Sequence, residues 1–238
     1  MKTDGTSASR TIFAKSGGLF GVFSNDGFRN YLRALQFSLY TCRRPLDGFW
    51  DLIHEKRGSL AAAHTIVILA TLMQIVYLTM TNFTFININM ETFSSLFVVM
   101  NMVGPLLLFS LANWCLTTLF DGKGRISDIY MGYAYAMVPQ TIIRAVITPL
   151  THVVTYDEMM ILVMMWYIGE LWFYLLILCA MKQIHDYTFS KAVITTVLSL
   201  AAMGIMIFIF LMFFAVVSDG VAYFYSLGQE ALFRIRRG

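Results

Sequence analysis

Long apolar runs alternate with short polar segments between Leu60 and Val217. Five of the runs reach about 20 residues or more, the length that a helix needs to cross a ~30 Å hydrocarbon core. Lipid offers no partner to backbone N–H and C=O groups, so each run is expected to be helical. The pattern predicts an all-α membrane protein whose domain 60–217 is a bundle of five transmembrane helices. The predicted spans are 60–80, 94–119, 129–150, 158–181 and 192–217.

The composition supports a membrane protein. Of the 238 residues, 58% are hydrophobic and 13% are charged, whereas soluble domains have about 45–50% apolar and about 25% charged residues. We therefore expect the protein to contact a lipid bilayer and other integral membrane proteins, and not to bind nucleic acid.

The placement of the positive charges predicts the orientation. Nine Lys and Arg residues precede Leu60, and the second and fourth connections also carry basic residues, whereas the connections 81–93 and 151–157 have none. Cytoplasmic segments are enriched in Lys and Arg, so the N-terminus is expected in the cytoplasm and the C-terminus outside. Arg234, Arg236 and Arg237 do not fit this orientation. Either they flank a short helix on the outer surface, or the number of spans is wrong by one.

The segments outside the membrane domain are expected to differ in structure. Residues 1–18 predict a flexible tail, 19–59 predict two cytoplasmic amphipathic helices, and 218–238 predict an extracytoplasmic amphipathic tail. Residues 19–59 have two compatible interpretations, an interfacial anchor for the first span or a docking surface for a cytoplasmic partner. Cys42, just before the membrane, is either a plain thiol or an acylation site. The predicted docking residues are Phe28, Arg29, Arg33, Phe49, Trp50, Lys56 and Arg57.

Two charged residues fall inside predicted spans, where charges are costly. Arg144 lies in the third span and Glu170 near the middle of the fourth, at depths that differ by roughly 7 Å at 1.5 Å per residue. Spans joined by a short loop are usually neighbours, so we expect Arg144 and Glu170 to form a buried ion pair. The pair either fixes how the two spans dock or forms a proton- or ligand-sensitive site in a transport path.

Other polar residues and prolines recur within the spans. Polar side chains at steps of about four residues predict interhelical hydrogen bonds or the lining of a cavity. Prolines break the helical hydrogen-bond ladder, so the second and third spans are expected to be kinked. The residues concerned are Asn101, Asn113, Tyr133 and Gln140 for the polar stripe and Pro105 and Pro139 for the kinks.

No catalytic or metal-binding motif is present in the sequence. The four histidines and three cysteines are dispersed, and HExxH, GxSxG, Walker and GxGxxG patterns are absent. We therefore expect no enzyme, no metal and no cofactor.

Several short motifs together resemble the Yip domain family, in its bacterial branch. They are Arg44–Trp50, Leu119–Gly124, Asp128–Tyr130, Tyr133–Pro139, Ile184–Tyr187 with Lys191, and Glu230–Arg234. The resemblance implies a five-span bundle with a cytoplasmic N-terminus and no catalytic residues. Eukaryotic members bind Rab-type GTPases in vesicle traffic, but this chain lacks an Asp-Leu-Tyr-Gly-Pro element before the first span. A small GTPase is therefore not the expected partner.

Three functions remain open. The first is a non-catalytic accessory subunit or scaffold of a larger membrane assembly in a bacterial plasma membrane, for instance with the subunits of an ABC-type transporter. The second is a small solute or ion transporter or channel that acts alone. The third is a vesicle-trafficking adaptor that binds a small GTPase.

Overall fold

The computed structural model describes residues 25–85, 93–120 and 122–237, except for the side chains of residues 25–30 and of some residues near the C-terminus. The predicted tail 1–18 lies outside the described residues. The described part is helical, with one short 3-10 turn at Tyr156–Glu158. The helices are α1 (Asn25–Arg43), α2 (Pro45–His54), α3 (Leu60–Met80), α4 (Ser95–Leu119), α5 (Ile126–Ala136), α6 (Val138–Leu150), α7 (Met159–His185) and α8 (Phe189–Arg237).

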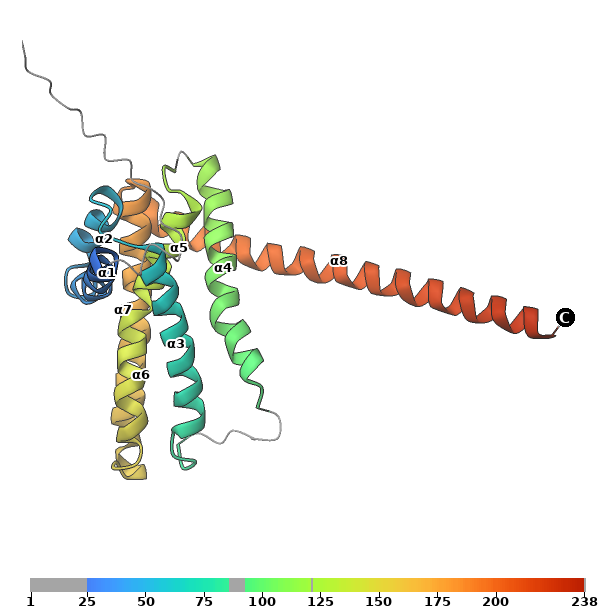
Figure 1. Cartoon of the computed structure of the whole chain (residues 1–238), viewed down its shortest axis with the longest axis horizontal. Helices are drawn as coiled ribbons and strands as arrows, with labels where there is room; N and C mark the ends of the chain where they lie inside the picture. Colours follow the sequence, from blue (N-terminus) through green and yellow to red (C-terminus); the bar gives the residue numbers. More distant parts are fainter. Residues whose placement is uncertain (1–24, 86–92, 121, 238) are drawn as a thin grey trace, which may run out of the picture.

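Helices α3 to α7 form a bundle (Figure 1). Helix α6 packs against α3 and α7, and α5 packs against α3, α4 and α7. The end of α3, the start of α4 and the connection 151–158 lie at one end of the bundle. The connection after α4 and the turn between α7 and α8 lie at the other end, so the connections with and without Lys and Arg are at opposite ends.

Four helices are long and apolar enough to cross a membrane, namely α3, α4, α7 together with the preceding 3-10 turn, and α8. This confirms a multi-pass membrane protein, but the structure does not confirm the predicted number of five spans. The predicted span 129–150 appears as α5 and α6, of 11 and 13 residues, separated at Met137. Pro139 explains the break, because proline has no N–H to donate and its ring crowds the carbonyl four residues earlier. Helix α4, in contrast, continues through Pro105.

The hairpin of α1 and α2 is fixed to the side of the bundle. The Tyr31 hydroxyl donates to Thr65 Oγ1 of α3 at 2.8 Å. Trp172 and Gln183 of α7 donate to the carbonyls of Cys42 and Leu46 at 3.3 and 3.0 Å. These hydrogen bonds hold α1 and α2 against α3 and α7.

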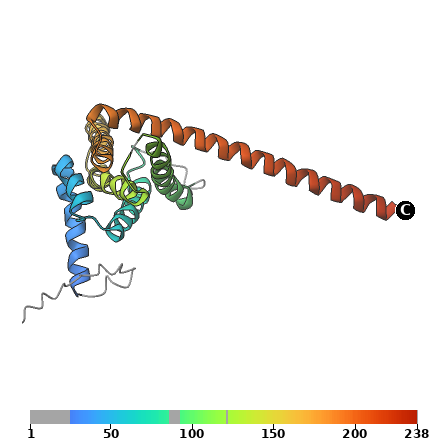
Figure 2. The same cartoon turned by 90° about the horizontal axis from the view of Figure 1, so that it is seen from above.

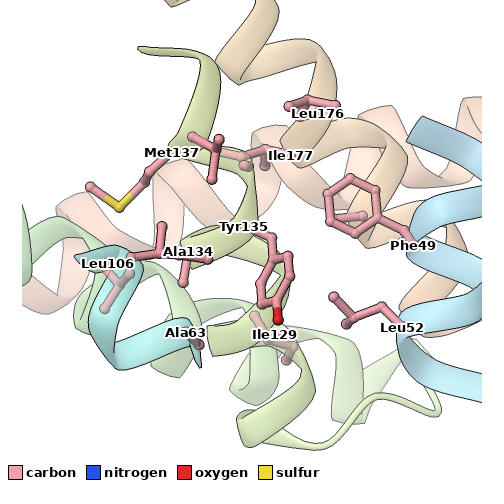
Figure 3. Close-up of a cluster of buried hydrophobic side chains, with 14 of the residues drawn as sticks. Phe49, Leu52, Ala63, Leu106, Ile129, Ala134, Tyr135, Met137, Leu176 and Ile177 are labelled. Carbon is pink, nitrogen blue, oxygen red and sulfur yellow. The ribbon is translucent and has the colours of Figure 1, made fainter. Parts of the chain in front are cut away.

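Tyr135 lies at the centre of the apolar core. Figure 3 shows its ring between Phe49 and Leu52 of α2 on one side and Ala134 and Leu106 on the other. All five side chains are at most 1% exposed, and the Tyr135 hydroxyl donates to the Ala34 carbonyl at 3.3 Å. The apolar face of α2 is therefore part of the protein core.

Helix α8 differs from the predicted fifth span and tail. One helix of 49 residues replaces the predicted elements 192–217 and 218–238, and it leaves the bundle sideways (Figures 1 and 2). Only its first turns pack against α4 and α7, through buried residues such as Ala192, Thr195 and Ser199. None of its most apolar 18-residue window is buried. The Ser218–Gly220 segment does not end the helix, because one glycine costs only about 1 kcal/mol in a helix.

Candidate functional site

The predicted intramembrane charges meet between α6 and α7. Arg144 Nη2 lies 2.9 Å from Glu170 Oε1, and their side chains are 8% and 15% exposed. Gln140, one turn before Arg144, also donates from Nε2 to Glu170 Oε1. These three residues, which we call the ion-pair site, neutralise the two charges and join α6 to α7.

The ion-pair site leaves part of the guanidinium without a partner. Arg144 Nε and Nη1 are buried and make no hydrogen bond, and the same holds for Gln74 Oε1 of α3. A buried donor or acceptor without a partner costs about 1–3 kcal/mol. The site therefore has spare hydrogen-bonding capacity, which a small polar molecule such as water would satisfy.

A cavity of about 160 Å³ lies beyond the ion-pair site, toward the end of the bundle that carries the 151–158 connection. Ile147 and Trp166 line it, each about one helical turn from a charged residue of the pair. Tyr77 of α3 also lines the cavity. The cavity is only half enclosed, and it approaches the ion-pair site without being lined by any of its three residues.

A second polar cluster lies at the opposite end, where α4, α7 and α8 meet. His185 Nε2 is 3.0 Å from Asn113 Oδ1, and Asn113 Nδ2 donates to Ser199 Oγ at 2.9 Å. Asn113 and Ser199 are 0% exposed and His185 is 2% exposed. We call these three residues the histidine node; they connect the ends of α4 and α7 to the first turns of α8.

The loop that follows α4 closes over the histidine node. The Gly124 N–H lies 3.2 Å from His185 Nδ1. A Cβ atom at Gly124 would lie 2.4 Å from Ile184 Cγ2 and 2.7 Å from His185 Cε1, and one at Gly122 would lie 2.6 Å from Thr117 Cβ. Side chains do not tolerate such distances, so the loop can approach α7 this closely only with glycine at both positions.

Aromatic and charged side chains complete the same end of the bundle. Tyr187 stacks on His185 with ring centroids 5.2 Å apart, and its hydroxyl donates to the Phe120 carbonyl at 3.0 Å. Lys191 Nζ donates to the same carbonyl and lies 4.3 Å from the centroid of the Tyr187 ring. The motifs around Phe120–Gly124, Ile184–Tyr187 and Lys191 are thus neighbours in space, although up to 71 residues separate them.

The histidine node was not predicted from the sequence. Asn113 was assigned to a polar stripe, and His185 was treated as one of several dispersed histidines. The sequence contained one indication of this cluster. Glycines, a histidine and a lysine all fall in the second and fourth connections, which are the connections that carry basic residues. Which of them touch depends on the rotation of three helices, which periodicity alone does not give.

The predicted polar stripe is not a single face. Asn101 is exposed and its side chain bonds to the Phe97 carbonyl of its own helix, whereas Asn113 is fully buried. Each four-residue step turns an α-helix by about 40° past one full turn, so 12 residues separate two side chains by about 120°. Tyr133 lies between Phe109 and Phe173, with both centroids at 5.4 Å, and Gln140 belongs to the ion-pair site.

The predicted docking residues do not form one surface either. Phe49 is 0% exposed and packs in the core, so its assignment to a membrane or partner surface is wrong. An amphipathic pattern does not distinguish burial in protein from burial in lipid. Trp50 is 44% exposed and stacks on His54. Arg33 and Lys56 are exposed, and Arg57 pairs with Asp51 and Glu55. The side chains of Phe28 and Arg29 lie outside the described residues.

A model of the Yip1 domain matches residues 39–217, which include the α2 core residues, the ion-pair site and the histidine node. No curated protein and no solved structure matches the chain. Because the family model covers most of the sequence, the chain belongs to the Yip1 domain family of membrane proteins.

Proposed function

We propose that this protein is a non-catalytic scaffold or accessory subunit of a larger membrane assembly in the plasma membrane of a bacterium. The observation that carries the proposal is the exposure of α8. Its hydrophobic window has no buried residue within the chain, and side chains such as Phe208, Phe210 and Phe213 are 62–67% exposed. Large contiguous apolar surfaces mark membrane or protein contact sites.

The rest of the molecule supports a scaffold. Helices α1 and α2 are bonded to α3 and α7, and the two polar sites join the bundle internally. A rigid bundle that carries one apolar arm is suited to hold the spans of another protein. We propose a transport complex, for instance one with ABC-type transporter subunits, as the assembly.

The proposed orientation keeps the N-terminus in the cytoplasm. The connections rich in Lys and Arg lie at the end of the bundle where α7 joins α8 (Figure 1), and such connections favour the cytoplasmic side. In this proposal α5 and α6 together make one broken crossing, and α8 makes the fifth, so that the C-terminus is extracytoplasmic. In the structure α8 runs sideways, so this crossing requires α8 to turn toward the bundle axis when its partner is present.

Gly204 offers a sharp test of the scaffold proposal. A Cβ atom at Gly204 would have no neighbour within 4 Å, so Gly204→Trp should leave the bundle folded. The protein, extracted with a gentle detergent, is expected to bring down stoichiometric membrane partners, and Gly204→Trp should lower their yield severalfold. The matched control is Leu107→Trp on the exposed face of α4, which should not. A lone, monodisperse protein from native membranes would contradict the proposal.

A second candidate function is a small transporter that acts alone. It is favoured by the half-satisfied guanidinium of Arg144 and by the cavity of about 160 Å³ beyond it. This function predicts solute flux into proteoliposomes of the purified protein, and Glu170→Gln should change the flux. If the purified protein shows no flux but is isolated with stoichiometric partners, the scaffold function is supported and the transporter function is not.

A further inference from the structure

Helix α1 runs across the bundle instead of along it. In Figure 1 the bundle helices are seen from the side and α1 is seen nearly end-on, whereas in Figure 2, turned by 90°, the blue helix α1 is seen along its length. Membrane-spanning helices are tilted on average by only about 20° from the bilayer normal. A helix that crosses them in this way lies roughly in the plane of the membrane.

The contact of α1 with α3 places it just inside the membrane surface. The Tyr31 hydroxyl bonds to Thr65, which lies five residues after the first residue of α3, Leu60, or about 7.5 Å along the helix axis. Interfacial helices bury their apolar face about 5–10 Å into the boundary between headgroups and acyl chains. Helix α1 therefore lies at the depth of an interfacial helix, in the leaflet at the end of the bundle where α7 joins α8.

The side of α1 that faces away from the bundle is amphipathic. Leu32, Leu39 and Tyr40 are 43%, 52% and 36% exposed, and Arg33 is also exposed. An α-helix turns about 100° per residue, so these four positions fall within an arc of about 120°. Leu32 and Leu39 lie at one edge of the arc, which we call the leucine edge, and Arg33 and Tyr40 lie at the other, which we call the polar edge.

The two edges of α1 face in opposite directions relative to the membrane surface. Helix α2 packs beside Thr41, since a Cβ atom on Gly48 would lie 2.7 Å from Thr41 Cα, and α2 lies nearer the end of the bundle than α1 (Figure 1). Tyr31 contacts α3 within the span. Around α1, the polar edge is next to Thr41 and the leucine edge is next to Tyr31, each about 80° away. The leucine edge is therefore directed toward the membrane interior and the polar edge toward the membrane surface.

Two exposed arginines follow at the turn between α1 and α2. Arg43 is the last residue of α1, within the exposed arc, and Arg44 precedes α2. Neither guanidinium makes a hydrogen bond or ion pair with the residues that the structure describes, whereas Arg57 pairs with Asp51 and Glu55. Arginine extends its charged group from apolar surroundings toward water, and guanidinium groups bind phosphate in a bidentate manner. The turn is therefore suited to bind phosphate groups at the membrane surface.

We propose that the outer face of α1 is embedded in the phospholipid leaflet at this end of the bundle, with the leucine edge among the acyl chains and with Arg43 and Arg44 bound to the phosphates of anionic phospholipids. A lipid leaflet presents acyl chains and phosphates in the same order as the two edges of α1 require. The surface of a protein partner has no such fixed order. The scaffold proposal concerns α8, so this inference does not depend on it.

Fluorescence quenching in vesicles tests the orientation of α1 with two adjacent positions. The full chain, with Cys42→Ala, Cys115→Ala and Cys179→Ala, carries a bimane label on a single cysteine, either Leu32→Cys or Arg33→Cys. It is reconstituted into vesicles of phosphatidylcholine and phosphatidylglycerol. Phospholipid brominated in its acyl chains should quench the label severalfold more strongly at position 32 than at position 33. Iodide on both sides of the membrane should quench the two labels in the reverse order.

Two results would overturn the embedding of α1. Strong quenching by iodide at both positions would place its outer face in water, and weak quenching by both agents at position 32 would show that protein covers it. The variants Leu39→Cys and Tyr40→Cys repeat the comparison two turns later in the helix. Both residues are exposed, so this second pair decides the matter if a variant of the first pair does not fold.

The preference for anionic lipid tests the two arginines. With the label on Leu32→Cys, brominated phosphatidylglycerol should quench at a severalfold lower mole fraction than brominated phosphatidylcholine. The combination of Arg43→Gln with Arg44→Gln should remove most of this preference. The matched control is Arg125→Gln, at an exposed arginine at the same end of the bundle, which should keep it. Equal quenching by the two lipids before substitution, or an unchanged preference in the double variant, would contradict the assignment of the phosphates to Arg43 and Arg44.

Discussion

The bundle α3–α7 and the long helix α8 differ in how far their side chains are covered by other parts of the same chain. In the bundle, two buried charged side chains pair with each other, and the apolar face of α2 is covered by the core. Beyond Met203, α8 has an apolar surface with no buried residue among those that the structure describes. The difference indicates that the bundle has an internal core, although α3, α4 and α7 also expose apolar side chains, whereas the far part of α8 has no buried residue and depends wholly on its surroundings. Changes of the same chemical kind should therefore have different effects in the two regions.

The largest expected effect follows loss of Glu170. Glu170→Ala leaves Arg144 as a buried charge without a counterion, which costs about 3–5 kcal/mol of stability. Denaturant titration of the purified protein in mixed micelles would measure this loss. The double variant Arg144→Met with Glu170→Met removes both charges at similar volume and should recover most of it. A loss below about 1 kcal/mol in the single variant would show that the pair does not hold the bundle together.

Glycine-to-alanine substitutions should have opposite signs in the two regions. Gly124→Ala places a Cβ atom 2.4 Å from Ile184 Cγ2, and such overpacking costs about 1–3 kcal/mol. Gly204→Ala meets nothing within 4 Å and should stabilise the helix by up to about 1 kcal/mol. Thermal unfolding of the two variants side by side measures the contrast. Equal destabilisation would mean that α8 packs against its own chain around Gly204.

Thiol reactivity reports whether α1 stays on the bundle. Burial raises the pKa of the Cys42 thiol to about 11, so near pH 8 almost none of it is the reactive thiolate. In a Cys115→Ser, Cys179→Ser background, maleimide should label Cys42 at least about tenfold more slowly in the folded protein than after unfolding. The folded-state rate should rise steadily as the pH increases toward 11. Rapid labelling at pH 7 would show that α1 detaches.

The smallest effect is expected at an exposed ion pair. Lys123 Nζ lies 3.1 Å from Asp186 Oδ2, with side chains 72% and 38% exposed. Exposed pairs contribute about 0–1 kcal/mol because water screens them. Lys123→Ala should therefore change the unfolding midpoint little, and high salt should change it no further. A loss comparable to that of Glu170→Ala would mean that exposure does not explain the difference between the two pairs.

The hydropathy of the chain and the depths of the charged residues within the predicted spans were sufficient to predict part of this structure. The first span was predicted as 60–80, and α3 has the same limits. The proximity of Arg144 and Glu170 followed from rise per residue and from the short connection between their spans. Pro139 also indicated where the third span departs from a regular helix. These features depend on local sequence and on the thickness of the membrane.

Other features depend on how helices are rotated and on what covers them. The contact of His185 with Asn113 joins residues 72 positions apart, and no periodicity specifies it. The apolar face of α2 was predicted to lie at a membrane or partner surface, yet Phe49 lies in the core, since apolar residues favour lipid and protein interiors alike. The 49-residue length of α8 was missed because hydropathy falls near Ser218 while helical structure continues.

Site-specific photo-cross-linking from α8 tests most directly the claim that its apolar surface belongs to a partner. A photoreactive phenylalanine analogue at Phe210 and, as the bundle control, at Leu107 is activated in intact membranes; these side chains are 66% and 54% exposed. We predict adducts of higher mass with another protein from Phe210 and none from Leu107. Cross-links from Phe210 to α3 or α4 of the same chain, or to lipid alone, would contradict the account.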